Sequence, residues 1–178
     1  PAHTEGHSAQ CPPKIAELLD VVASLPSPAT VCEVGYNGGH SALAYMASAG
    51  STAAFYSFDL GDHAYSFLSK EYMRRRFSSV PMHFITGRSQ TTMVDLLHDL
   101  ASNGTAGGLR CDVLLVDGGH EFEQALADFL NARLFMDPRR PHVIMLDDVQ
   151  SNYQAFNPED AVPGDVWNAA IAAGMVKE

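Results

Sequence analysis

The sequence predicts an α/β fold in which helices flank a doubly wound, mostly parallel sheet. Short apolar runs alternate with longer segments whose apolar residues recur at helical spacing. Two of the runs, "VLLV" at 113–116 and "VIML" at 143–146, are apolar throughout, as in strands that are buried on both faces. Alternation at this rhythm implies right-handed crossovers and a sheet that is covered by helices on both sides.

The same patterns give each expected element. The first helix is expected at 13–25, where "PKIAELLDVVASL" has a proline in its first turn and "PSP" follows it. The five apolar runs predict strands at 30–35, 53–59, 82–87, 111–118 and 142–148. The segments between and after them predict helices at 39–49, 63–77, 90–102, 121–136 and about 164–173.

Composition sets limits on organisation and partners. The 178 residues suit one domain spanning 1–178, with a loose polar leader at 1–11. A net charge of -10 argues against nucleic acid as a partner, and no apolar stretch reaches the roughly 18 residues of a membrane span. A sheet of this kind often continues with a closing pair of strands, which this chain lacks. Either the fold is minimal or the chain has been cut there.

The basic run and the cysteines favour ordinary structural roles. "RRR" at 74–76 is typical of a solvated helix face, and an anionic-substrate site is the alternative. Cys32 and Cys111 each lie in a strand-like run and are expected to be buried, reduced thiols, while Cys11 lies in the leader. Because no disulfide framework is indicated and no signal peptide is visible, we expect a reducing, cytoplasmic location.

A glycine-rich turn follows the first expected strand. In "EVGYNGGHS" the glycines allow the backbone to approach a ligand closely, and the next helix offers unpaired N–H groups. The dinucleotide pattern G-x-G-x-x-G is not met, because Asn37 stands where the second glycine would be. The acidic Glu33 precedes Gly35 by two positions. A tight turn without a ligand is the alternative interpretation.

This E-x-G-x-N-x-G form resembles the first motif of class I S-adenosylmethionine-dependent methyltransferases, which have a Rossmann-like fold. The resemblance implies that the turn wraps the methionine part of the cofactor and that Glu33 binds its ammonium group. Asp59 ends the second strand, about 20 residues further on, and could accept hydrogen bonds from ribose hydroxyls in this cofactor or in NAD. "GRSQ" at 87–90 then implies contacts along the adenine, although Ser89 could instead be only a helix N-cap.

Acidic residues at the ends of two further strands indicate a cation site. Asp117 ends the fourth strand, and Asp147 and Asp148 end the fifth. Carboxylates that converge from neighbouring strand ends repel one another, and oxygen ligands of this kind suit Mg²⁺. The alternative is that Asp147 and Asp148 only cap a turn.

The run D-G-x-H, a helix with a further acid at Asp128, and a strand ending in "LDD" resemble methyltransferase family 24 within class I. They are also similar to metal-dependent O-methyltransferases of the catechol and macrolide-sugar types. The resemblance covers residues 30 to 175 and implies that Asp117, Asp147 and Asp148 hold Mg²⁺. His120 stands where catechol-type enzymes have a lysine base, so it could take a hydroxyl proton, cap a helix or contact the cofactor. Asp128 is expected on a solvent- or loop-facing position.

Together these observations predict an O-methyltransferase that uses S-adenosylmethionine and Mg²⁺ to methylate a small hydroxylated molecule. Its expected catalytic residues are His120 and Asp117. A nicotinamide-dependent oxidoreductase and a non-catalytic nucleoside-binding domain remain alternatives, and a homodimer is left open. Tyr36, Tyr65, Phe67 and the 151–163 loop are expected to shape the acceptor site. Tyr153, Phe156 and Trp167 could line it, and ordinary packing is the alternative for these three aromatic residues. The expected cofactor-binding residues are Glu33, Gly35, Tyr36, Asn37, Gly39, Ser41, Asp59, Arg88, Ser89, Asp117 and His120.

Overall fold

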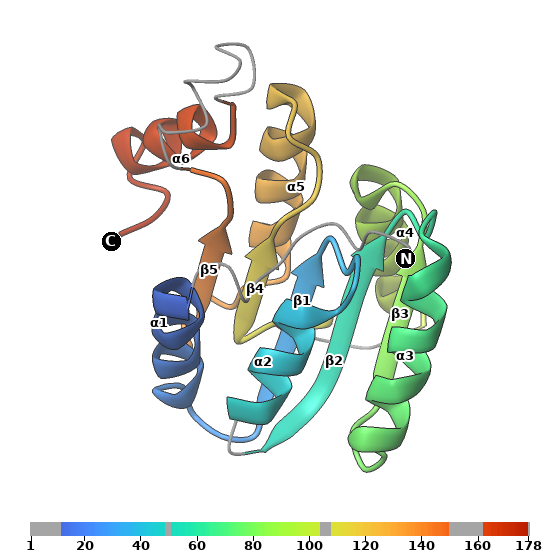
Figure 1. Ribbon diagram of the computed structural model, residues 1–178. Coiled ribbons are helices and arrows are strands. Elements are labelled where there is room, and N and C mark those ends of the chain that lie inside the picture. The colour runs from blue at the N-terminus through green and yellow to red at the C-terminus, as the bar shows by residue number, and fades with distance from the viewer. Residues whose placement is uncertain (1–11, 49–50, 104–107, 150–161, 178) are drawn as a thin grey trace.

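The computed structural model describes residues 12–48, 51–103, 108–149 and 162–177. Within them one five-stranded sheet runs in the order β3-β2-β1-β4-β5, and every neighbouring pair is parallel. All the strands therefore end at the same edge of the sheet, toward the top of Figure 1. The strands are β1 (Ala29–Val34), β2 (Thr52–Asp59), β3 (Met82–Thr86), β4 (Val113–Val116) and β5 (Val143–Leu146).

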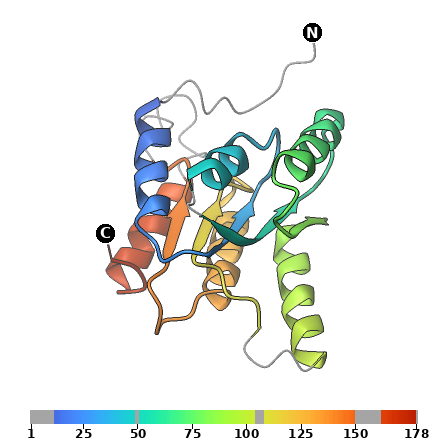
Figure 2. The ribbon, with the colours of Figure 1, turned by 90° about the horizontal axis from the view of Figure 1, so that it is seen from below.

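Helices cover both faces of this sheet, as Figure 2 shows from below. α1, α2 and α3 lie over one face, and α4, α5 and α6 lie over the other. The predicted α/β class, a Rossmann-like, doubly wound parallel sheet flanked by helices, is confirmed. The helices are α1 (Pro12–Ala23), α2 (His40–Ser48), α3 (Ala64–Arg76), α4 (Ser89–Ser102), α5 (Phe122–Leu134) and α6 (Val162–Ala172).

The core lies in two layers on either side of the sheet. Side chains alternate between the faces along each strand, so Val31 and Val113 pack under α1 to α3, whereas Cys32 and Leu114 face α4 and α5. All four residues of β4 are buried, as expected for a strand with helices on both faces. The expectation of burial on both faces is wrong for β5, whose four residues are all partly exposed, because β5 is the edge strand of the sheet.

The sheet reverses its direction of winding between β1 and β4. β1 is followed by α2 and β2 on one side, whereas β4 pairs with the other side of β1 and is followed by α5 and β5. At such a reversal the segments after the two strands diverge and leave a crevice, which is where open α/β sheets bind ligands. The fold thus places the glycine-rich turn beside Asp117.

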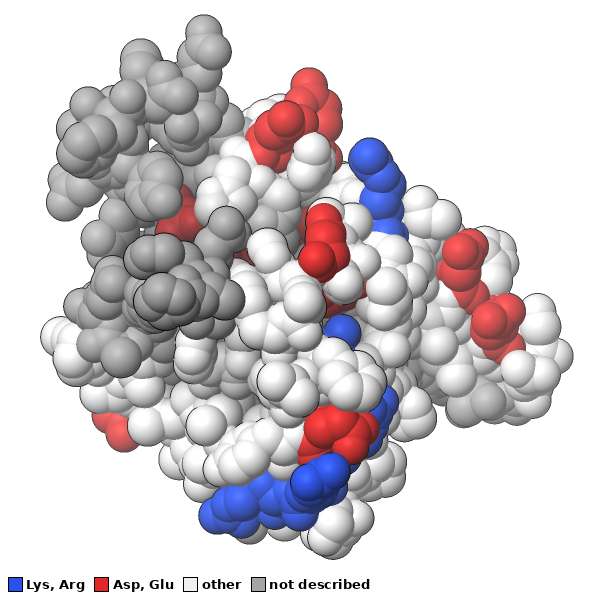
Figure 3. Space-filling view, turned by 45° about the vertical axis from the view of Figure 1, so that its right-hand side comes forward, with Lys and Arg blue, Asp and Glu red and all other residues white. Residues whose placement is uncertain are grey.

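The basic run at 74–76 forms the last turn of α3, and Figure 3 shows basic side chains gathered near this end of the helix. Arg74 and Arg75 both lie close to the carboxylate of Glu71, at 3.3 and 3.8 Å. The guanidinium of Arg74 also stacks over the ring of Phe84. These contacts, at the opposite end of α3 from the sheet's carboxyl edge, favour the interpretation as a solvated helix face.

The expectation of two reduced core thiols is wrong. Cys32 in β1 and Cys111, just before β4, are buried as expected, but they form a disulfide bond. The pairing of β1 with β4 brings the segment just before β4 close to β1, and the two Cα atoms lie 5.9 Å apart, within the range a disulfide requires. The two cysteines lie 79 positions apart in the sequence, so their contact could not be predicted from local patterns. Cysteine usage therefore no longer indicates a reducing compartment, and the cytoplasmic location stays a prediction.

Membrane association was excluded above from the lack of a long apolar stretch. In the parts of the chain that the structure describes, none of the helices has both the length and the apolar character needed to cross a bilayer.

The disulfide joins residues 79 positions apart, so it should restrict the unfolded chain strongly. We expect Cys32→Ala/Cys111→Ala to lower the free energy of unfolding by roughly 2–4 kcal/mol, measured by urea denaturation. Reducing agent should shift the wild-type midpoint downward and leave that of the double variant unchanged. Equal wild-type midpoints with and without reductant, with the reduced thiols verified by alkylation, would contradict this expectation.

Candidate functional site

The candidate site lies at the carboxyl edge of the sheet, where backbone hydrogen bonds continue from strand to strand beyond the strand ends. The N–H of Gly35 donates to Phe58 at 2.8 Å, and the N–H of Asp117 donates to Val34 at 2.9 Å. The N–H of Asp147 donates to Val116 at 2.9 Å. These bonds hold the segments after β1, β4 and β5 in register, so the predicted site residues on them come together.

The glycine-rich turn after β1 requires glycine at two positions, where a Cβ would meet different neighbours. Gly35 has a positive φ, and a Cβ there would overlap the carbonyl oxygen of Asp117. Gly39 also has a positive φ, and a Cβ there would overlap the side chains of Tyr36 and Ser69. Between them Asn37 adopts φ of 46°, a left-handed conformation that asparagine tolerates better than most residues. The motif read from the sequence therefore describes a backbone path that few other residues can follow.

Asp59 at the end of β2 holds this turn. Its Oδ2 accepts the backbone N–H groups of Tyr36 at 2.9 Å and Asn37 at 3.0 Å. Its Oδ1 accepts the N–H of Gly61 at 2.8 Å. The carboxylate was predicted to bind a ribose, and that role stays a prediction. Because each carboxylate oxygen has two lone pairs, Oδ1 can accept one further hydrogen bond while it keeps this turn in place.

Three polar residues of α3 also fasten the turn, and sequence reasoning assigned this role to none of them. The Ser66 hydroxyl donates to the carbonyl of Asn37 at 2.6 Å, and the Tyr65 hydroxyl donates to the Asn37 side chain. The Ser69 hydroxyl donates to the carbonyl of Gly38 at 2.7 Å. A signal was present, because positions 65, 66 and 69 share one face of a helix. Serines on a helix are nonetheless predicted to face solvent unless the groups that accept their hydrogen bonds are known.

Glu33 is fully buried in β1 beneath the turn. Its Oε2 accepts a hydrogen bond from the Ser41 hydroxyl at 3.0 Å, whereas its Oε1 is buried without a hydrogen-bond partner among the described residues. Burial raises the pKa of this carboxyl to about 8, and the neighbouring Ser41 and Ser57 hydroxyls act in the opposite direction, although only the Ser41 hydroxyl has hydrogen-bond geometry to the carboxylate. A buried carboxylate oxygen without a donor is costly, so the site is suited to a cationic or N–H-bearing ligand.

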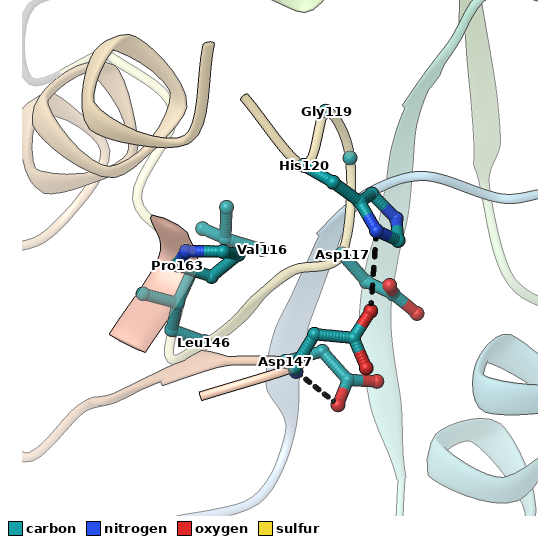
Figure 4. Close-up of a pocket in the computed structure, with 9 residues that line it drawn as sticks. Val116, Asp117, Gly119, His120, Leu146, Asp147 and Pro163 are labelled. Atoms are coloured by element: carbon teal, nitrogen blue, oxygen red, sulfur yellow. Dashed lines mark hydrogen bonds and ion pairs between the residues drawn. The ribbon is translucent and has the colours of Figure 1, made fainter. Parts of the chain in front are cut away.

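The segments after β4 and β5 form a second group of polar side chains. Ligand atoms of Asp117, His120 and Asp148 all lie within 4.8 Å of one another. The Nδ1 atom of His120 is 3.5 Å from Oδ2 of Asp148, as the dashed line in Figure 4 shows. A shallow pocket at this group is lined by Val116, Asp117, Gly118, Gly119, His120, Leu146, Asp147, Asp148 and Pro163.

Asp147 lies in the same pocket but differs from the other acids. Its Oδ1 accepts the backbone N–H of Asp148 at 2.7 Å, which matches the turn-capping alternative for this residue. Asp148 has a φ of 55°, so the chain turns sharply here and sends its side chain toward His120. The predicted metal trio of Asp117, Asp147 and Asp148 is therefore neighbouring, but the tightest cluster contains His120 in place of Asp147.

The segment after β3 gives two corrections. Arg88, and not Ser89, occupies the N-cap of α4, so the N-cap alternative for Ser89 is wrong. The Ser89 hydroxyl instead donates to Oδ1 of Asp128 at 2.6 Å. Asp128 has none of its surface exposed, so the solvent-facing expectation is wrong, whereas the loop-facing alternative agrees with its place beside Gly118. Helical periodicity predicts only which face of α5 carries Asp128. It does not show that this face is covered by Ser89, which lies 39 residues earlier in the chain.

Aromatic residues expected near an acceptor site are only partly described. Trp167 packs edge-on against Phe129 of α5, with ring centroids 6.4 Å apart, as in ordinary core packing. Tyr65 holds the glycine-rich turn, and Phe67 is exposed on α3. Tyr153 and Phe156, with most of the 151–163 loop, lie outside the described residues, as does the leader at 1–11.

Comparison with known proteins identifies the family. A family model for a methyltransferase domain, methyltransferase family 24, matches residues 32–149. This range begins in β1 and ends just after Asp148, so it contains the strand-end segments described above. Curated protein sequences contain no match to the chain.

Solved structures support the same fold. A methyltransferase from Podospora anserina, PaMTH1, solved with SAH, has a TM-score of 0.65 and 15% identity, over 91% of this chain and 68% of its own. MycE from the mycinamycin biosynthetic pathway, solved with Mg and SAH, has a TM-score of 0.52 and 15% identity, over 89% of this chain. TrmN from Thermus thermophilus has a TM-score of 0.50 and 19% identity, over 70% of this chain.

This chain spans 39% of the length of MycE and 34% of that of TrmN. At these identities the structures establish a shared fold, while the family match rests on the sequence of two thirds of the chain. The glycine-rich turn, the acidic strand ends and the family model agree, and this chain belongs to methyltransferase family 24, within the class I methyltransferase fold.

Proposed function

We propose that the protein transfers a methyl group from S-adenosylmethionine to a hydroxyl oxygen of a small molecule, with help from Mg²⁺. The observation that carries the cofactor is the buried Oε1 atom of Glu33, which has no partner among the described residues and lies beneath the glycine-rich turn. PaMTH1 and MycE were both solved with SAH, the product of this cofactor, which supports the proposal.

The residues present fit the cofactor along its whole length. Glu33 would bind the ammonium group, because a cation restores the charge balance that burial makes costly. The turn from Gly35 to Gly39 would hold the methionine part, since glycine at both ends allows the positive φ that this backbone path requires. Asp59 would accept ribose hydroxyls. Arg88 and Ser89 would border the adenine, and Tyr36, Asn37 and Ser41 would support this site from the glycine-rich turn and the start of α2.

The pocket at the ends of β4 and β5 fits a small divalent cation. Asp117 and Asp148 offer carboxylate oxygens, the ligand type that Mg²⁺ prefers, and Asp147 lies within the same lining. Bound there, Mg²⁺ would act as a Lewis acid that lowers the pKa of an acceptor hydroxyl. MycE was solved with Mg and SAH and, in another structure, with Mg, SAH and mycinamycin VI. That complex supports a small-molecule acceptor.

His120 is the proposed general base. Its Nδ1 faces the carboxylate of Asp148, which orients the ring. Nε2 would then be free to take the proton from the acceptor hydroxyl, and the bound cofactor would supply the methyl group. Positioning the two reactants supplies much of the rate enhancement in such a transfer. Asp117, on the strand end next to His120, would help to hold the reacting groups and so share the catalytic role.

The two alternatives are disfavoured. A nicotinamide-dependent oxidoreductase needs a glycine where Asn37 stands, and the family match is to methyltransferases. A non-catalytic nucleoside-binding domain would not need the Asp117, His120 and Asp148 group. Methyl transfer to a panel of hydroxylated, protein and RNA acceptors, with and without chelator, tests the proposal. Transfer to protein or RNA alone would contradict a small-molecule acceptor.

Asp59→Ala removes the acceptor of three backbone N–H groups and the proposed ribose contact. We expect the affinity for SAH to fall by roughly tenfold to a hundredfold, measured by calorimetry, because both the turn and the ligand lose hydrogen bonds to a charged group. Asp62→Ala, an exposed acid three residues away, is the matched control and should bind as the wild type does. Equal affinities for the two variants would remove Asp59 from the site.

Glu33 gives a pH dependence of binding. Its carboxyl has a pKa of about 8 in the empty protein, so the neutral form dominates below that pH. Pairing with the ligand's ammonium requires the charged form. The affinity for SAH should therefore rise with pH toward about pH 8, by up to about tenfold per unit.

Glu33→Gln keeps the shape and removes the titration, so its affinity for SAH should be low and flat over the same pH range. Calorimetry in buffers of different ionisation enthalpy would detect the proton that the wild type releases on binding and the variant does not. A wild-type affinity that falls as the pH rises would be incompatible with the proposed pairing.

Asp148→Ala removes a carboxylate from the proposed metal group. We expect loss of Mg²⁺ binding in calorimetry and loss of any Mg²⁺ dependence of methyl transfer, because one carboxylate contributes a large part of the local charge. Asp147→Ala should have the same effect if all three predicted acids are ligands, and a smaller effect if Asp147 only caps the turn. Asp165→Ala, an exposed acid in the first turn of α6, is the control. Unchanged Mg²⁺ binding by Asp148→Ala would overturn the assignment.

A further inference from the structure

The carboxylate of Asp128 is buried between two segments that carry predicted cofactor residues. It projects from α5, and its Oδ1 accepts hydrogen bonds from the Ser89 hydroxyl at 2.6 Å and from the Gln90 amide at 2.9 Å. Ser89 and Gln90 form the start of α4, directly after β3. Asn131, one turn further along α5, donates to the backbone carbonyl of Gln90 at 3.3 Å. Two side chains of α5 therefore form hydrogen bonds with this segment.

The other oxygen of Asp128 faces the segment after β4. A Cβ on Gly118 would come within 2.8 Å of Oδ2, so the chain passes this atom closely enough to require glycine there. The backbone of Gly119 also lies close enough to favour the charged carboxylate, against the burial that raises its pKa. Asp128 therefore binds the segment after β3 through Oδ1, while its Oδ2 lies beside the segment after β4 without a hydrogen-bond partner among the described residues.

A buried carboxylate at this position lowers the stability of the fold unless its contacts with the two segments compensate. Burying a charge without full pairing destabilises a fold, and an apolar side chain of similar size would pack at lower cost. A carboxylate accepts hydrogen bonds through both oxygens and donates none, so it can collect donors from two segments at once. Ser89 and Gln90 donate to Oδ1 on one side, and the Gly118–Gly119 segment lies beside Oδ2 on the other.

We propose that Asp128 is a positioning residue that fixes the Arg88–Gln90 segment against the Gly118–Gly119 segment and so sets the width of the nucleoside end of the cofactor site. The link between the two segments stands on geometry alone, while its effect on a nucleoside rests on the proposed function. Asp128 touches no ligand in this account. It acts through Ser89 and Gln90 on one side and through the segment that leads to His120 on the other.

The link is tested first without any ligand. Asp128→Asn keeps the size of the side chain but replaces one oxygen with a donor, so one of the two segments must face a mismatched group. Amide hydrogen exchange, followed by mass spectrometry, should speed up roughly tenfold or more in peptides covering 87–92 and 117–121, and remain unchanged in β1 and α2. Asp95→Asn, the same change on the exposed face of α4, is the control. Unchanged exchange in both segments would overturn the proposal.

The functional part uses two ligands that differ only at the methionine end. Asp128→Asn should weaken SAH and 5′-methylthioadenosine by the same factor, roughly tenfold, whereas Glu33→Gln should weaken SAH alone. Adding Ser89→Ala to Asp128→Asn should cost little more, because the two residues form one unit. An additive double variant, or a loss confined to SAH, would show that Asp128 does not act through the nucleoside end.

The outcomes separate the two proposals. If the wild type binds neither ligand, the cofactor assignment fails, and the exchange measurement still decides whether Asp128 joins the two segments. If Asp128→Asn does not fold, Ser89→Ala is the replacement variant. It removes the same 2.6 Å hydrogen bond by deleting the donor and keeps the buried carboxylate. Its exchange in 87–92 should then rise and its affinity for 5′-methylthioadenosine should fall. If Ser89→Ala shows neither of these changes, the proposal is wrong.

Discussion

The close approach of the β1 and β4 ends is the constraint on which the rest of the site depends. Asp117 donates its backbone N–H to Val34, and the absence of a side chain on Gly35 lets the turn lie against the Asp117 carbonyl. This contact stands at the point where the sheet reverses its winding. A larger residue at Gly35 would push the glycine-rich turn away from the acidic pocket, and so would separate the two proposed binding sites.

The surrounding polar groups divide into those that hold the backbone and those left for a ligand. Asp59 uses both oxygens on backbone N–H groups, and Ser66 and Ser69 of α3 occupy carbonyls of the same turn. Glu33 has one buried oxygen without a donor among the described residues. A site prepared in this way pays the cost of ordering its backbone before the ligand arrives, which favours tight and oriented binding.

Secondary structure and topology were largely predictable. Each of the five strands and six helices in the described residues falls at its expected place, because apolar runs and helical spacing reflect burial directly. The glycine and acid motifs also led to the strand ends where Gly35, Asp59, Asp117 and Asp148 now lie. Contacts between distant segments were not predictable. The disulfide of Cys32 with Cys111, the buried place of Asp128 and the role of Ser66 and Ser69 all depend on which segments the sheet brings together.

The sequence by itself determined the class of fold, the family and the chemical types present at the sheet's edge. It could do so because strand burial and tight turns impose residue choices that are visible locally. The tertiary structure alone decided which of those groups are neighbours. It brought His120, in place of Asp147, into one group with Asp117 and Asp148, because a left-handed turn at Asp148 directs that carboxylate from the end of β5 toward the segment after β4. Pairing of this kind depends on distances through space, which spacing along the chain does not encode.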